Sequence, residues 1–449
     1  MVTVLIKNAA AIVTCDDKNN VFKNVDMYIS EGEIISIGNI TDEADVTYDM
    51  SGKYIYPGLI NTHHHLYQTF TRNLLRVQNM ELFDWLTTLY EIWRGIDEET
   101  IFLSSLTGLG ELVKYGCTTC FDHHYVFPRA SENFIDRQFE AANKIGIRFY
   151  ASRGSMSLGK KDGGLPPDEL VQDLDTILSD SERLIKKYND TSKFSMHNVA
   201  LAPCSPFSVT PELLKESAMM ARKYGVRLHT HVAETKDEER FCLEKFGMRP
   251  LEFMESVGWT GNDVWYAHGI HFNDEELKKL AQTGTGIAHC PVSNMKLASG
   301  VCRVPDMIDL GVKVGLAVDG SASNDCSNLM AEMRASYLMH RLIYSNKAPS
   351  GYDILKLATK GSASVLGRDD IGELSVGKAA DFFAIDSESL ELVGTFNDPA
   401  GLLATTGYSK PADYVFVGGK IICEKGVLKG IDEEETAREA NKKVKELIK

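Results

Sequence analysis

Eight short apolar runs recur through the middle of the chain, each apolar at its start and polar at its end. Segments long enough for helices, such as 98–115 and 168–188, separate them. Repeated strand–helix alternation is typical of a parallel sheet, and eight such units fit a closed (β/α)8 barrel of the TIM type. Because the carboxyl ends of barrel strands carry the active site, chemistry is expected where these runs turn polar. The runs are 58–65, 116–124, 147–155, 198–209, 226–234, 264–272, 285–294 and 313–325.

Both ends of the chain are rich in short β-type runs. Val2–Ile40 and the stretch after Gly367 show such runs joined by tight turns, one of them at Val417–Lys420. The charged, amphipathic last segment is typical of a helix. The predicted organisation is a small β-sandwich domain from residues 1–56 and 368–432, a catalytic barrel from 57–367 and a C-terminal helix from 433–449.

Composition narrows the functional classes. The 449 residues carry a formal charge of −15 and no basic block, which argues against nucleic acid or an anionic membrane as a partner. No apolar run reaches the roughly 18–20 residues that a membrane-spanning helix needs. Nine scattered cysteines, an odd number, favour free thiols in a reducing cytoplasm. We therefore expect a cytoplasmic protein.

Histidines cluster at the polar ends of the runs. His63 and His65 lie two apart, so both side chains can reach one point, and His229 and His231 repeat this spacing. Asp319 ends the last run with a carboxylate. Imidazole nitrogens with one carboxylate suit Zn²⁺ or Fe²⁺ and leave a coordination position for water, whose pKa then falls to about 7. The pattern predicts a metal-dependent hydrolase.

The motifs PGLINTHHH, HTHVAE, YAHGIH, AHCPVSN and VDGSASND follow one another at barrel-strand spacing. In this order they resemble the amidohydrolase superfamily, in its branch of cytosine, guanine and triazine deaminases. The resemblance covers almost the whole chain. It implies one divalent metal ion per subunit, zinc with ferrous iron as the alternative, and a homodimer or higher oligomer. The ligands that it implies are His63, His65, His231 and Asp319.

The resemblance also assigns catalytic roles. It implies that Asp319 takes a proton from water, that His268 orients this water and contacts substrate, and that Glu234 shuttles protons to and from the substrate. The fourth barrel run, 198–209, has no lysine to bridge a second metal. This absence indicates one metal and deamination rather than the opening of an amide ring.

Further segments, including HHHLYQTFTRN and LAPCSPFSVTPE, resemble the 8-oxoguanine deaminase group of this branch. They imply a small heterocyclic substrate, with conversion of 8-oxoguanine to urate and ammonia as the leading reaction. Alternatives are aminohydrolases of isoxanthopterin or another pterin, guanine or a hydroxytriazine, and, more remotely, a non-catalytic scaffold of the same fold. Cys204 stands where related guanine deaminases often have arginine, which argues against a plain guanine pocket. The expected substrate contacts, besides Glu234 and His268, are Tyr67, Gln68, Arg72 and Cys204.

Other conspicuous residues have simpler interpretations. Cys117 and Cys120 lie inside an apolar run, so packing is favoured over metal or redox chemistry. The aromatic side chains of segment 83–93 are predicted to pack a helix, with capping of the site or contact with a partner subunit as the alternatives. Pocket-lining and packing roles both stay open for His123, His124 and His289.

Overall fold

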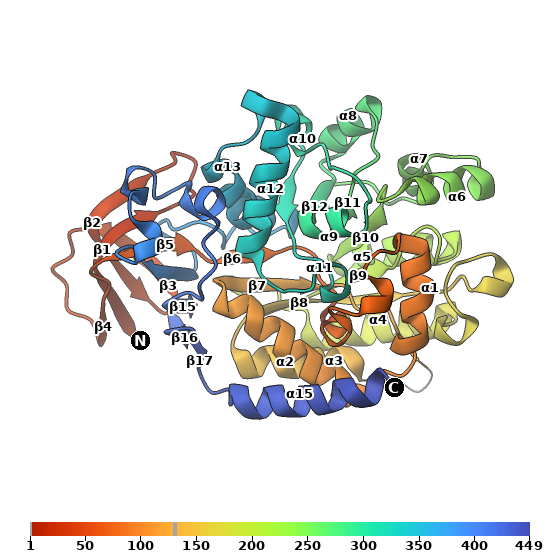
Figure 1. The fold of residues 1–449 in the computed structure, drawn as a ribbon, viewed down its shortest axis with the longest axis horizontal. Coiled ribbons are helices and arrows are strands. Elements are labelled where there is room, and N and C mark those ends of the chain that lie inside the picture. Colours follow the sequence, from red (N-terminus) through yellow and green to blue (C-terminus); the bar gives the residue numbers. More distant parts are fainter. Residues whose placement is uncertain (1, 129–132) are drawn as a thin grey trace.

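The computed structural model describes residues 2–128 and 133–449, and its centre is an eight-stranded parallel barrel (Figure 1). Strand pairing runs in sequence order, and the Thr62 N–H donates to the Leu316 carbonyl at 3.3 Å to join the last strand to the first. Each strand overlaps one of the eight predicted apolar runs, so the predicted (β/α)8 barrel is confirmed. The strands are β6 (Leu59–Asn61), β7 (Cys117–Asp122), β8 (Arg148–Ser155), β9 (His197–Pro203), β10 (Arg227–Val232), β11 (Val264–His268), β12 (Gly286–His289) and β13 (Val314–Leu316).

Helices connect the barrel strands, and local sequence signals set their ends. At α8, Asn273 and Glu276 form a reciprocal capping box, and Gly284 ends the helix in the left-handed conformation that glycine adopts without steric cost. The helices from the first barrel strand onward are α1 (Leu82–Trp93), α2 (Glu98–Lys114), α3 (Phe134–Ile145), α4 (Leu174–Tyr188), α5 (Pro211–Tyr224), α6 (Lys236–Phe246), α7 (Pro250–Ser256), α8 (Asp274–Thr283), α9 (Pro291–Lys296), α10 (Val304–Leu310), α11 (Ser321–Asn324), α12 (Leu329–Tyr344), α13 (Gly351–Lys356) and α14 (Ser362–Val365).

The two chain ends build one β domain beside the barrel, as expected (Figure 1, left). Its strands form a nine-stranded mixed sheet, in which β5 pairs antiparallel with β14 and thereby joins the two ends. Ile6, Met27, Phe382 and Phe416 belong to a hydrophobic core of its own. The strands are β1 (Thr3–Val13), β2 (Val21–Ser30), β3 (Glu33–Gly38), β4 (Val46–Asp49), β5 (Lys53–Pro57), β14 (Phe382–Asp386), β15 (Tyr414–Val417), β16 (Lys420–Glu424) and β17 (Val427–Leu428).

The chain ends in α15 (Glu433–Leu447), which lies along α2 (Figure 1). Ala440 packs in a small cluster with Leu103, and Lys443 Nζ donates to Asp97 at 2.6 Å. Across residues 2–128 and 133–449, no helix is both long and apolar enough to cross a membrane. All nine cysteines fall within this described part, and all are free.

Candidate metal and catalytic site

The barrel topology gathers the predicted site residues from strands far apart in the sequence. His231 lies in β10 and His268 ends β11, while His63 and His65 follow β6. His63 and His65 were predicted to lie on a strand. Strand β6 ends at Asn61, however, and both residues lie in the segment just beyond it. Parallel strands end at one face of a barrel, and all of these side chains therefore meet there.

His268 and Asp319 both have left-handed backbones, with φ of 70° and 62°. This conformation is costly for residues with a Cβ, and it persists where the surrounding structure enforces it. One such constraint is the Asp319 N–H, which donates to the His63 carbonyl at 3.1 Å. The backbone itself thus directs these two side chains into the barrel mouth.

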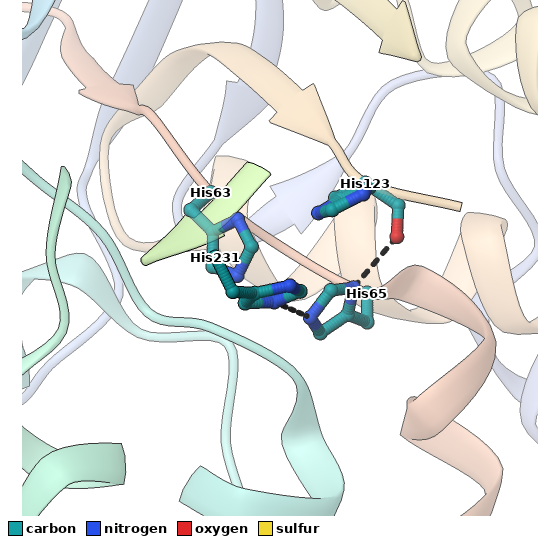
Figure 2. A group of neighbouring side chains, drawn as sticks. All are labelled: His63, His65, His123 and His231. Carbon is teal, nitrogen blue, oxygen red and sulfur yellow. Dashed lines mark hydrogen bonds between the residues drawn. The ribbon is translucent and has the colours of Figure 1, made fainter. Parts of the chain in front are cut away.

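The side chains of the three predicted histidine ligands converge on a small buried volume, with His123 beside them (Figure 2). The Nε2 atoms of His63 and His65 each lie 3.3 Å from Asp319 Oδ1. The Nε2 atoms of His65 and His231 lie 3.2 Å apart. The structure therefore brings all four predicted ligands together.

Hydrogen bonds on the far side of each ring fix where its proton sits. His65 Nδ1 lies 2.6 Å from the His123 carbonyl, and His231 Nδ1 lies 2.6 Å from the Cys204 carbonyl. A carbonyl only accepts, so each Nδ1 carries the hydrogen and each Nε2 presents a lone pair. Two lone pairs 3.2 Å apart repel unless a cation shares them. The donor set therefore fits a metal ion.

His63 obtains the same tautomer through a relay. The Trp265 carbonyl lies 3.0 Å from His229 Nδ1, which therefore donates, and His229 Nε2 accepts from His63 Nδ1 at 2.8 Å. The relay leaves His63 Nε2 buried and without a hydrogen-bond partner among the described residues. His229 is thus placed as the residue that orients a ligand rather than as a ligand itself.

We expect His229→Phe to weaken metal binding by about 10–100-fold, the usual cost of losing such a supporting partner. Phenylalanine fills the ring's place but cannot accept the His63 proton, so the other tautomer becomes accessible. Chelator competition measures the affinity, and thermal melting of the metal-free protein reports folding separately. His124→Gln is the matched control, because His124 is equally buried but bonds the Val126 carbonyl outside the relay. Unchanged affinity in His229→Phe would refute the relay.

Asp319 supplies the negative charge of the cluster. Burial alone raises its pKa, but the close approach of His63 and the nearby His65 and His268 hold the pKa well below its usual value. Its other oxygen, Oδ2, accepts from Ser293 Oγ at 2.6 Å. The carboxylate is therefore kept ionised in a buried site.

Glu234 has the opposite electrostatic character. Burial, reinforced by the charge of Asp319, raises its pKa to about 7 against the opposing effect of His268, so both protonation states occur near neutral pH. Its Oε2 lies 3.5 Å from His268 Nε2, and His268 Nδ1 bonds Asn294 Oδ1 at 2.8 Å. Glu238 accepts the N–H groups of Ala233 and Glu234 at 2.8 and 2.9 Å and holds this loop in place. Glu234 is thus positioned as a proton donor and acceptor.

His123 joins the same cluster, a role that the sequence left open. One nitrogen from each of His63, His65, His123 and His231 falls within a group 4.8 Å or less across, and His63, His268 and Asp319 form a second such group. The His123 ring stacks on His231 with centroids 4.8 Å apart. Its Nε2 bonds the Ala202 carbonyl, while Nδ1 has no partner in the described chain. His123 therefore borders the ligand set.

A pocket opens beside the cluster. Among the predicted substrate contacts, Gln68 and Cys204 line it together with Glu234 and His268. Gln68 lies against the backbone of Gly320, where a Cβ would come within 1.9 Å of its Oε1. The lack of a side chain at Gly320 therefore admits the Gln68 amide to the site.

Tyr67 and Arg72 are not among the residues that line this pocket. The short helix Leu66–Thr71 carries Arg72 away from the cluster, and its Nη2 donates to Glu111 Oε2 at 2.9 Å and Ser321 Oγ at 3.2 Å. Tyr67 is buried, with its hydroxyl 3.5 Å from Gln68 Nε2. Both residues thus support the wall of the site from behind.

The sequence did not single out several lining residues. Leu82 and Leu86 are two of them. They come from α1 together with Trp85, whose aromatic segment had capping of the site as its alternative interpretation, so this helix covers the site as well as packing. Apolar and aromatic side chains on a helix carry no chemical signature, and only the fold shows which ones face a ligand. The other lining residues that were not singled out are Tyr125, Phe207, Leu297 and Ser323.

Comparison with known proteins agrees with this geometry. The model of the amidohydrolase family matches residues 54–422. The chain is 49% identical to an 8-oxoguanine deaminase of Pseudomonas aeruginosa over 86% of this chain and 85% of the relative. It is 41% identical to a hydroxydechloroatrazine ethylaminohydrolase of Pseudomonas sp. strain ADP over 98% and 95% of the two chains.

A crystal structure of an atrazine chlorohydrolase from Arthrobacter aurescens in complex with zinc superposes with a TM-score of 0.94. Its sequence is 34% identical, and the match covers 99% of this chain and all of the other. That neighbour and the buried histidine cluster together support a divalent metal ion at this site. On the family match, the barrel and the identity to these relatives, the chain belongs to the amidohydrolase family.

Proposed function

We propose that this protein is a metal-dependent aminohydrolase that converts 8-oxoguanine to urate and ammonia. The observation that carries the proposal is the meeting of Glu234, His268 and Asp319 beside three histidines whose Nε2 lone pairs converge, at the edge of a pocket that these residues line together with Gln68 and Cys204. The 49% identity to an 8-oxoguanine deaminase supports the choice of substrate.

The ligands would be His63, His65, His231 and Asp319. When bound, a divalent ion acts as a Lewis acid that makes water acidic enough to lose a proton near neutral pH. We propose zinc, in line with the zinc-complexed neighbour, although ferrous iron suits the same donors. Elemental analysis of protein expressed with each metal, with turnover per bound ion, distinguishes the two.

Asp319 and Glu234 then carry out different proton transfers. Asp319 Oδ2, 4.0 Å from His268 Nε2, accepts the proton of the attacking water, and His268 orients that water. Glu234, with a pKa of about 7, donates a proton to the ring nitrogen beside the amino-bearing carbon. Protonation makes this aromatic carbon a better electrophile. As the C–N bond breaks, the proton held by Asp319 passes to the departing ammonia, and Glu234, now a carboxylate, takes the proton of the added hydroxyl. Each such proton transfer contributes about 10²–10⁴-fold.

The test is release of ammonia and urate from 8-oxoguanine by the zinc-loaded enzyme. Isoxanthopterin, guanine and an amino-hydroxytriazine are assayed beside it. Turnover of another heterocycle alone would refute the substrate but not the reaction. No turnover of any of them by metal-replete protein would refute the proposed reaction and favour a non-catalytic scaffold.

A further inference from the structure

A side chain that lines the pocket carries a hydrogen-bond donor for which the described residues supply no partner. Trp85 lines the pocket from α1 and is only 3% exposed. Its indole Nε1 is buried and has no hydrogen-bond partner among the residues that the structure describes. Indole N–H groups usually find an acceptor when buried, and leaving one unsatisfied costs about 10–100-fold in an equilibrium. A bound ligand is the acceptor that this pocket lacks.

Packing alone does not explain Trp85, as its neighbour on the same helix shows. Trp93 is fully buried, and its Nε1 donates to Thr71 Oγ1 at 3.1 Å. The two indole rings contact edge to face, with centroids 5.6 Å apart. Of the two, Trp93 is satisfied within the protein, and Trp85 alone lines the site. The sequence-based interpretation of this aromatic segment as helix packing therefore holds for Trp93 but is incomplete for Trp85.

We infer that Trp85 is a specificity-determining residue whose indole N–H binds a carbonyl oxygen of the heterocycle, at the end of the ring system away from the reacting carbon. Given the proposed function, the Trp85 N–H donates to the C8 carbonyl, which 8-oxoguanine has and guanine lacks. An indole N–H only donates. It can therefore bond a carbonyl oxygen there but not a ring N–H, which is itself a donor.

The arrangement of the pocket supports placing the C8 end of the substrate near Trp85. The carbon that bears the amino group must reach Glu234, His268 and Asp319, which come from the strand ends of the barrel. Trp85 comes instead from α1, a helix outside the strands, together with the apolar Leu82 and Leu86. In 8-oxoguanine the C8 carbonyl lies opposite the amino-bearing C2. A ring that presents C2 to the cluster thus extends its C8 end away from it.

Gln68 offers a complementary group. Its Oε1 is also buried without a partner among the described residues. This oxygen lies against Gly320, which follows Asp319, so Gln68 belongs to the cluster end of the pocket, whereas Trp85 comes from α1. An oxidised purine carries neighbouring carbonyl and N–H groups at C8 and N7, whereas guanine has no carbonyl at C8. A site built to bond such a group discriminates against the analogue that lacks it.

The test compares Trp85→Phe with Trp93→Phe and the wild type, all loaded with zinc. Calorimetric titration measures the affinity for urate and for xanthine, the purine that lacks the C8 carbonyl and the N–H group that accompanies it. We expect the wild type to bind urate more tightly and Trp85→Phe to lose about 10–100-fold in urate affinity with little change for xanthine. Trp93→Phe should keep the wild-type preference, although its stability falls. The melting temperature of each variant reports folding.

An equal loss for both purines, or an unchanged preference in Trp85→Phe, would overturn the assignment. Steady-state kinetics provide a second readout, since loss of this contact should lower kcat/KM for 8-oxoguanine more than for guanine. Failure of the proposed function is recognised separately. In that case the wild type would not turn over 8-oxoguanine at all, whatever the binding preference of the Trp85 variant.

Discussion

Glu234→Gln is expected to lower kcat for the deamination by at least about 10²–10⁴-fold while the metal content stays at the wild-type level. Glutamine keeps the size of the side chain but has no titratable proton. Burial raises the pKa of Glu234 to about 7, so the wild-type carboxyl can both give and take a proton near neutral pH. The amide can do neither. Release of ammonia measures the loss, and elemental analysis measures the metal.

Glu239→Gln is the matched control for this change. Glu239 lies in α6, five residues along the chain, and its carboxylate pairs with Arg249 at 2.6 Å and Lys236 at 3.1 Å, away from the pocket. It should keep full activity. Loss of metal in Glu234→Gln would instead identify Glu234 as a ligand and leave the proton transfers without a carrier.

The barrel could be predicted from sequence because its strands carry a strong local signal. Buried parallel strands are apolar along most of their length, and polar residues appear where they end, as in β11. The β domain was predicted from its turns, but the pairing of β5 with β14 joins residues more than 300 positions apart. No local pattern encodes such a partner, and the path of the sheet had to come from the structure.

For the site too, some features could be predicted from the sequence and others could not. The meeting of His63, His65, His231 and Asp319 could be predicted, because the resemblance to the family assigns these four residues as ligands and barrel strands end at one face. The role of His229 in orienting His63 could not, since it depends on which carbonyl faces the far side of its ring. The alternation of HTHVAE does put both histidines of the segment on one face, and this was the available signal.

For Trp85 and Arg72, the sequence did not determine which side chain lines the pocket. Proximity in sequence to Gln68 suggested Arg72 as a substrate contact, yet its guanidinium pairs with Glu111 on α2. Trp85 was interpreted as packing, yet it lines the pocket. Both outcomes depend on the direction in which a side chain leaves a helix or turn. Hydrophobic periodicity does not determine that direction for the residues around a barrel mouth.

Asp319→Asn is expected to reduce turnover by about 10³-fold or more and also to weaken metal binding, because one side chain serves both purposes. Asparagine is nearly isosteric, but its amide is neutral and cannot accept the proton of water. Its nitrogen would also replace one of two oxygens that accept hydrogen bonds, Oδ1 from the Gly320 N–H and Oδ2 from Ser293. Asp319→Asn should lose more metal affinity than Glu234→Gln. This difference separates the roles of the two carboxylates experimentally.

Asp325→Asn tests whether this effect belongs to Asp319 or to any acidic residue after β13. Asp325 also has a left-handed backbone, with φ of 69°, and accepts the Asn73 N–H at 2.6 Å, but it does not line the pocket. We expect Asp325→Asn to keep its metal and nearly all of its activity. Because the two aspartates share backbone conformation but not position, loss of activity in both would point to distortion of the loop. Loss in Asp319→Asn alone, with metal affinity reduced, is the result that the buried carboxylate predicts, and full activity in that variant would refute its role as the base.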